Sequence, residues 1–224
     1  MPPILKTICL EMPFRIGSVN CYLLETGGGF FLIDTGSSNQ RRELQGELEG
    51  AGCQPGNLNL ILITHGDFDH TGNAAYLRSR FTSRIAMHAA DRGMAEDADM
   101  FFNRNKGNAL IGALVSRLSG FRKTDRFTPD ITVQDGFDLS EYGLDATVLG
   151  IPGHSKGSIG VLTASGDLFC GDLFSNTDKP ALNAIMDDPA SAAISLERLT
   201  RYPIQTVYPG HGKPFPLELV KEGD

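Results

Sequence analysis

The stretch LNLILITHGDFDH, residues 58–70, decides the fold of this chain. Its first seven residues form a continuous apolar run, which is typical of a strand buried on both faces. The next six residues contain four side chains that can bind a metal ion, namely His65, Asp67, Asp69 and His70, and Gly66 permits a tight turn among them. The stretch therefore predicts a buried strand that ends in a metal-binding turn.

Further strand-like runs and helical segments surround this stretch. The expected strands are 5–10, 20–24, 30–33, 84–87, 131–133, 146–149, 159–163, 168–170 and 205–208, and the expected helices are about 38–50, 71–80 and 189–201. Alternation of strands and helices indicates an α/β architecture. No linker interrupts the pattern, so we expect one domain over residues 1–224, with a helical insertion at about 91–126 that carries an apolar stripe at 110–118.

Composition narrows the class of protein. The chain has 224 residues, 41% of them hydrophobic and 21% charged, which suits one globular domain. A net charge of −7 without a basic cluster argues against a nucleic-acid partner. No segment reaches the roughly 18 apolar residues that a membrane span needs, and no signal peptide is evident, so we expect no membrane partner and a cytoplasmic location. The four scattered cysteines are expected to be reduced core residues.

Three more potential ligands occur far along the chain. His154, Asp172 and His211 each follow a glycine, and each is expected at or just after the end of a strand. Loops at strand ends are where α/β sheets usually place ligands, and glycine allows the backbone to pack closely around a site. A single histidine carries little information, but the conjunction of seven such side chains predicts a metal centre.

At these residues the sequence resembles the metallo-β-lactamase superfamily, whose signature is H-x-H-x-D-H followed by a distant His, an Asp and a final His. The resemblance extends over nearly the whole chain and implies a four-layer αβ/βα sandwich with two mixed β-sheets between helices. It implies a first metal held by His65, residue 67 and His154, and a second held by Asp69, His70 and His211. Asp172 would bridge the two ions.

Position 67 departs from that signature because it carries aspartate instead of histidine. We expect Asp67 to remain a ligand; the alternative is a weakened first site and a mononuclear enzyme. The extra carboxylate lowers the positive charge of the site and favours harder ions. The resemblance implies two divalent ions. Zinc is the first choice, and the carboxylate at position 67 makes manganese or iron the alternatives.

The resemblance implies a hydrolase in which a metal-bridging hydroxide attacks the substrate, with Asp69 orienting that hydroxide. The text around His154, Ile-Pro-Gly-His-Ser-Lys-Gly-Ser, is similar to glyoxalase II-like and lactonase-like branches. We therefore expect a small ester, thioester or lactone as substrate. A metal-dependent phosphodiesterase is the first alternative, a non-haem iron redox enzyme the second, and a non-catalytic binding protein the third.

Other residues outside the motif have a functional or a structural interpretation. Asp34, in Asp-Thr-Gly, either orients a ligating histidine or caps a turn, and His88 is expected to be structural. Lys156 could contact substrate or remain in solvent. Phe101 and Phe102 of the insertion either line the pocket or pack within the core or against a second copy, since a homodimer stays open.

Overall fold

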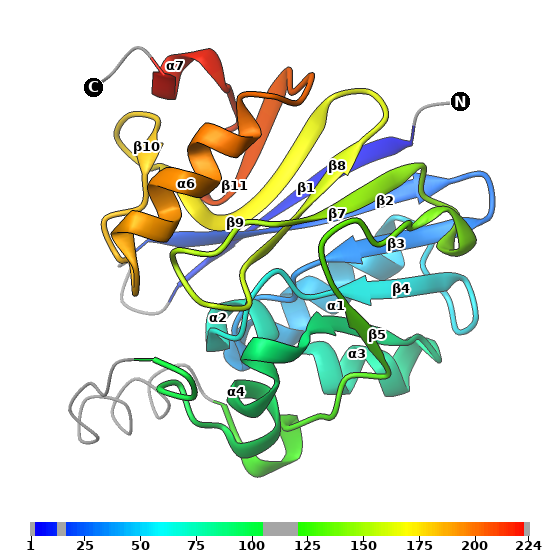
Figure 1. Ribbon diagram of the computed structural model, residues 1–224. Coiled ribbons are helices and arrows are strands. Elements are labelled where there is room, and N and C mark those ends of the chain that lie inside the picture. Colours follow the sequence, from blue (N-terminus) through cyan, green and yellow to red (C-terminus); the bar gives the residue numbers. More distant parts are fainter. Residues whose placement is uncertain (1–2, 13–16, 105–120, 222–224) are drawn as a thin grey trace.

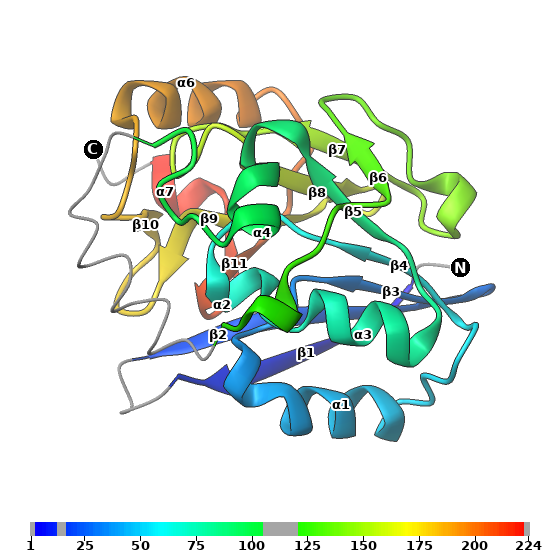
Figure 2. The same cartoon turned by 90° about the horizontal axis from the view of Figure 1, so that it is seen from below.

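The protein is described by a computed structural model that covers residues 3–12, 17–104 and 121–221. Two six-stranded mixed sheets lie face to face between helices, as expected from the sequence (Figures 1 and 2). Residues 105–120, which include the expected apolar stripe of the insertion, lie outside the described residues. None of the helices in the described part of the chain is long and apolar enough to cross a membrane.

The first sheet contains the N-terminal strands in sequential order. Its strands are β1 Ile4–Glu11, β2 Ser18–Thr26, β3 Gly29–Ile33, β4 Leu58–Leu62, β5 Ile85–His88 and β6 Ile131–Val133. The first three strands pair antiparallel, and the pairs from β3 to β6 are parallel. Parallel neighbours require crossover connections, and helices between these strands supply them.

The second sheet has the order β12-β11-β9-β8-β7, with β10 paired to β9. Its strands are β7 Ala146–Gly150, β8 Ile159–Thr163, β9 Asp167–Asn176, β10 Ala181–Leu182, β11 Thr206–Gly212 and β12 Phe215–Pro216. Of the described pairs in this sheet, β9–β11 is parallel and the others are antiparallel. Figure 1 shows β9 as a long, curved strand, in yellow, beside β8.

Helices cover the outer faces of both sheets. They are α1 Arg41–Gly50, α2 Phe68–Thr71, α3 Ala74–Phe81, α4 Arg92–Asp97, α6 Pro189–Leu199 and α7 Glu218–Lys221, with short 3-10 turns η2 Ser38–Gln40, η3 Ala89–Asp91, η4 Lys123–Asp125 and η5 Ser140–Tyr142. The helix expected over 71–80 is confirmed as α3, which begins three residues later, because Gly72 and Asn73 separate it from the short helix α2. Asn73 is buried, and its side-chain amide donates to the carbonyls of Thr35 and Ser37, which ties the break to the β3–η2 loop.

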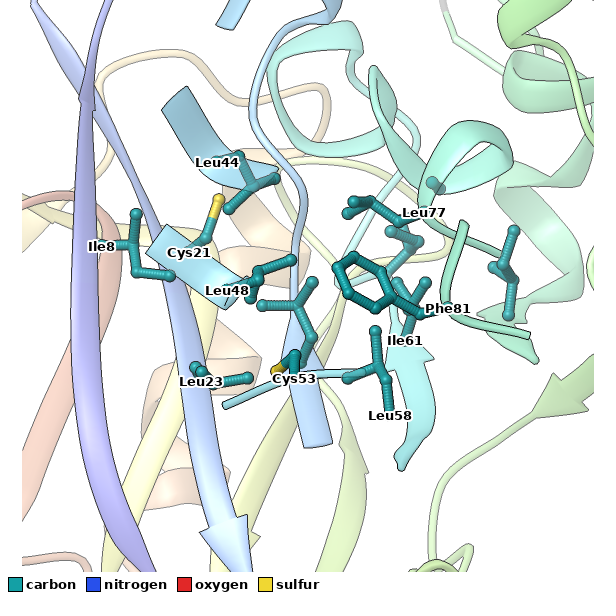
Figure 3. Packing of buried hydrophobic residues seen from close by; sticks show 14 of the residues in the cluster. Ile8, Cys21, Leu23, Leu44, Leu48, Cys53, Leu58, Ile61, Leu77 and Phe81 are labelled. Carbon is teal, nitrogen blue, oxygen red and sulfur yellow. The ribbon is translucent and has the colours of Figure 1, made fainter. Parts of the chain in front are cut away.

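Three apolar cores correspond to the three interfaces between the four layers. Figure 3 shows the first, where Leu44 and Leu48 of α1 and Phe81 of α3 pack on one face of the first sheet. The second lies between the sheets and includes Phe31 and Phe169. The third lies under α6, and its members are Leu149, Ile151, Leu168, Cys170, Leu173, Phe174, Ala192, Leu199, Val207, Phe215, Leu217 and Val220. These residues are almost fully buried, which stabilises a large apolar side chain by roughly 1.5–3 kcal/mol each.

All four cysteines are free thiols, as expected, but Cys9 is exposed and does not belong to the core. It lies on the edge strand β1, opposite Asn20 of β2, and strand alternation turns it away from the buried residues Ile8 and Leu10.

Candidate metal centre

The seven predicted ligands converge at one end of the two sheets. Their positions lie in the β4–α2 turn (His65, Asp67), in α2 (Asp69, His70), in the β7–β8 turn (His154), in β9 (Asp172) and in β11 (His211). One set of mutually close ligand atoms comes from His65, His154 and Asp172, and a second from Asp69, His70 and His211. Within each set the atoms lie within 4.8 Å of one another.

Asp67 adjoins the first of these sets. Its Oδ2 atom lies 2.9 Å from Nε2 of His154 and 3.6 Å from Nε2 of His65. Its other oxygen, Oδ1, accepts a hydrogen bond of 2.6 Å from the Arg104 guanidinium. The carboxylate therefore directs one oxygen to the two histidines and the other to the positively charged Arg104 side chain.

Asp172 belongs to the first set, with His65 and His154, and also faces the second. Its Oδ1 lies 3.4 Å from Nε2 of His70, and its Oδ2 lies 3.3 Å from Nε2 of His211. Asp69 approaches the same two histidines from the other side, at 3.4 Å from His211 and 3.9 Å from His70. The arrangement gives Asp172 the position that a bridging ligand would need.

The expected strand ends were wrong for two of these residues. Asp172 and His211 lie inside β9 and β11, which extend past the predicted ends at 170 and 208. Irregular backbone places their side chains in the centre: Gly171 has φ +50°, and the β9–β11 register shifts at Pro209. A Cβ at Gly171 would lie 2.5 Å from Oγ1 of Thr64, and one at Gly210 would overlap Asp172, so glycine is required for this close approach.

All four ligand histidines turn Nδ1 outward and Nε2 toward the centre. Nδ1 of His154 donates to the carbonyl of Ile185 at 2.7 Å, and Nδ1 of His211 donates to the carbonyl of Ser18 at 2.6 Å. A carbonyl can only accept, so Nδ1 carries the proton of the neutral ring, and Nε2 would present its lone pair to a metal ion.

Asp34 fixes the other two histidines, which decides between the two roles considered for it. Its Oδ2 lies 2.8 Å from Nδ1 of His70 and accepts from the Thr64 hydroxyl at 2.7 Å. That hydroxyl lies 3.0 Å from Nδ1 of His65 and can accept from it. Asp34 has φ +60°, an uncommon conformation for a residue with a side chain, and also accepts from the Thr64 amide.

Buried atoms without partners show that the centre fits metal ions. Among the described residues, Nε2 of His65, Nε2 of His70 and Oδ1 of Asp172 are buried and lack a hydrogen-bond partner. Such atoms are costly in a folded protein unless something binds them. Imidazole nitrogens and carboxylate oxygens are ligands for zinc, manganese and iron, so the donor set suits divalent first-row ions.

The electrostatics of the centre also favour cations. Burial lowers the pKa of His154 and His211, but the carboxylates of Asp67 and Asp172 outweigh it and raise these values to about 9 and about 10. Burial likewise opposes the charge on His70, yet Asp34, Asp172 and Asp69 hold its pKa well above the usual value. The cluster thus retains positive charge in the form of protons, which a metal ion would replace.

Two features near the centre carried no sequence signal. Arg104 lies between two carboxylates, since its Nε also donates to Asp187 at 2.8 Å. Asn183 donates its side-chain amide toward Asp172 at 3.4 Å. Arg104 is separated from Asp67 by 37 positions, and no spacing rule connects them.

Other residues considered from the sequence have plainer roles. His88 caps η3, where its Nδ1 accepts from the Ala90 amide at 3.2 Å, in agreement with the expected structural role. Phe102 packs over Gly93 of α4, where a Cβ would overlap its ring. Lys156 lines a cavity of about 270 Å³ beside Arg104 and Asp187.

Comparison with known proteins identifies the family of this chain. The model of the metallo-β-lactamase superfamily matches residues 15–211, which include all seven ligand positions. The chain belongs to the metallo-β-lactamase superfamily. Its relatives include human metallo-β-lactamase domain-containing protein 1, 28% identical over 92% of this chain and 66% of that protein. A hydroxyacylglutathione hydrolase of Shewanella baltica (strain OS155) is 28% identical over 67% of this chain.

Solved structures show the same fold. TTHA1623, in a di-iron-bound form, superposes with a TM-score of 0.74 at 28% identity and covers 98% of both chains. The chain spans 66% and 46% of the lengths of the human and Shewanella relatives. Superfamily membership supports a metal-dependent hydrolase. Because TTHA1623 is a di-iron form, the comparison does not decide which metal this chain binds.

Proposed function

We propose that this protein is a binuclear metal-dependent hydrolase that cleaves a small ester, thioester or lactone. The observation that carries the proposal is the common orientation of four histidines, three of them buried, whose Nε2 atoms face three carboxylates across one centre. Glyoxalase II-type relatives support a thioester or ester as the substrate class. The physiological metal in this proposal is zinc, with iron or manganese as alternatives.

His65, His154, Asp67 and Asp172 would hold one ion, and Asp69, His70, His211 and Asp172 the other. When bound, two such ions supply an activated water nucleophile and a Lewis acid for the substrate oxygen. Asp69 is half-buried and reaches toward both His70 and His211, so its free oxygen can accept a proton from the attacking water.

Two residues control the surroundings of that chemistry. Arg104 neutralises the outer oxygen of Asp67, which compensates for the carboxylate that replaces the family's histidine. Asp34 keeps the His70 ring in one orientation. Both contacts hold the ligand side chains in the orientation that metal binding needs, so these side chains do not have to move during the reaction.

The test is a substrate comparison on metal-loaded protein. A thioester, p-nitrophenyl acetate and a lactone are assayed beside bis-p-nitrophenyl phosphate, before and after chelation and with metal returned. The proposal predicts chelator-sensitive turnover of the carboxylic substrates, restored by metal and lost in Asp172→Asn. Preferential turnover of the phosphodiester would assign the protein to the phosphodiesterase alternative instead.

A further inference from the structure

Asp91 is a buried carboxylate that binds two loops of the metal centre without being a predicted ligand. It ends η3 and is only 1% exposed. Its Oδ2 accepts from the Gly66 amide at 3.1 Å and from the Ser155 hydroxyl at 2.5 Å. Its Oδ1 accepts from the Gly157 amide at 2.8 Å.

These three donors belong to loops from different sheets. Gly66 lies between His65 and Asp67, after β4 of the first sheet, whereas Ser155 and Gly157 follow His154 in the β7–β8 turn of the second. The first metal position therefore depends on how the two sheets are held together, and one link is the hydrogen bond of 2.9 Å from the Ile159 amide to the Thr64 carbonyl. Asp91, on a third segment after β5, bridges the two loops.

The fit around Asp91 is close on the side of the second loop. A Cβ at Gly157 would lie 2.5 Å from Oδ1 of Asp91 and 2.8 Å from its backbone nitrogen. Within the loop, Oγ of Ser158 accepts from the Ser155 amide at 3.0 Å and lies 2.8 Å from the Ser155 hydroxyl. The loop that carries His154 is thus internally bonded, and Asp91 holds its Ser155–Gly157 side, while Asp188 and Ile185 contact Gly153 and His154 from another segment.

We propose that Asp91 is a positioning residue that sets the separation of His65 and His154, and so the affinity of the first metal position. This inference rests on the proposed two-metal centre. Asp91 acts through the backbone of Gly66 and through the Ser155–Gly157 turn, since its described hydrogen bonds go to these donors and to neither histidine. A carboxylate is suited to this role because all of its lone pairs can accept, and three donors face it.

The variant Asp91→Asn tests the proposal with almost no change of volume. Its amide has one acceptor oxygen, so in either orientation an NH₂ group faces a backbone N–H, that of Gly157 or that of Gly66, and the hydrogen bond to that loop is lost. Asp125→Asn is the matched control, because Asp125 is also buried and also accepts from a backbone amide, that of Arg122, and its described side-chain contacts include none of the predicted ligands. Asp125 also pairs with Arg41, so the control is at least as disruptive to stability.

Two readouts separate positioning from general stability. Zinc titration against a chromophoric chelator should show the first ion bound about tenfold more weakly in Asp91→Asn, the lower end of what residues behind metal ligands contribute, with the second ion unchanged. The centroids of the His65 and His154 rings lie 4.6 Å apart. In an experiment on metal-free protein, the nuclear Overhauser contact between these rings should weaken in Asp91→Asn but not in Asp125→Asn.

Unchanged zinc affinity and an unchanged ring contact in Asp91→Asn would overturn the proposal. If the parent protein takes up fewer than two zinc ions, the two-metal function fails, and the metal-free ring contact still decides the role of Asp91. If Asp91→Asn does not fold, Gly157→Ala displaces the same loop with Asp91 intact and should give the same two changes; a Gly157→Ala protein that matches the parent in both would refute the role.

Discussion

The pair of Asp67 and Arg104 yields a quantitative prediction for the metal-free protein. Oδ1 of Asp67 lies 2.6 Å from the Arg104 guanidinium, with side chains 14% and 11% exposed. Breaking one partner of a fully buried pair costs about 3–5 kcal/mol. Residual exposure and the second carboxylate at Asp187 reduce this, so Asp67→Ala should lose about 2–3 kcal/mol of unfolding free energy.

A double-mutant cycle isolates the pair. Asp67→Ala and Arg104→Ala should each lower Tm by about 5–10 °C, at about 2–4 °C per kcal/mol for a chain of this length. The double variant should lose less than the sum of the singles, by about 1–2 kcal/mol. The assay is thermal and urea unfolding in EDTA, so that bound metal does not contribute.

Asp135 and Arg198 provide the matched control cycle. They form a bidentate pair on the surface, with side chains 51% and 35% exposed, and should couple by less than about 1 kcal/mol. Singles at 67 and 104 that add within about 0.5 kcal/mol would refute the pairing, because independent sites behave in that way.

Three further predictions concern the ligands and their supports. Asp34→Asn leaves one acceptor oxygen where the Thr64 amide and His70 use two, and it should weaken metal binding about 10- to 100-fold, measured by chelator competition; unchanged affinity would contradict its role. Gly210→Ala should abolish binding of the second ion, seen as halved metal content, because its Cβ overlaps Asp172. In metal-free protein, Tm should fall as pH rises through about 9 to 10. His154 and His211 have raised pKa values, so the stabilisation from their charge is fully present below the pKa of the unfolded chain, near 6.5, and is lost as pH rises through the pKa of the folded protein. The Tm increase on adding metal should grow over the same pH range, since the ligands must lose protons; a flat profile in EDTA would contradict these shifts.

The strands and the ligand motif could be predicted because they are local. The run 58–64 is dominated by leucine and isoleucine, and such a run can be recognised in the sequence without knowledge of any tertiary contact. The motif 65–70 places four donors within one turn, so their proximity follows from the chain itself. The resemblance then linked His154, Asp172 and His211 to that turn.

Features that depend on contacts between distant segments were not predictable. Asp172 and His211 lie within strands, and their side chains reach the centre because the backbone is irregular at Gly171 and Pro209. Neither irregularity has a periodic signature in the sequence. Arg104 and Asp91 contact the ligand loops across 37 and 25 positions, so only the folded arrangement reveals them. A sequence pattern reports which side chains can bind a metal, while the residues that hold those side chains in place are set by tertiary packing.

The most direct test of the two-metal centre is the metal content of the purified protein and of Asp172→Asn, measured by inductively coupled plasma mass spectrometry. Asp172 belongs to the first ligand set and faces the second, so the parent should hold about two ions per chain and the variant at most one. A parent that holds one ion or none, or a variant that holds as many as the parent, would contradict the binuclear centre.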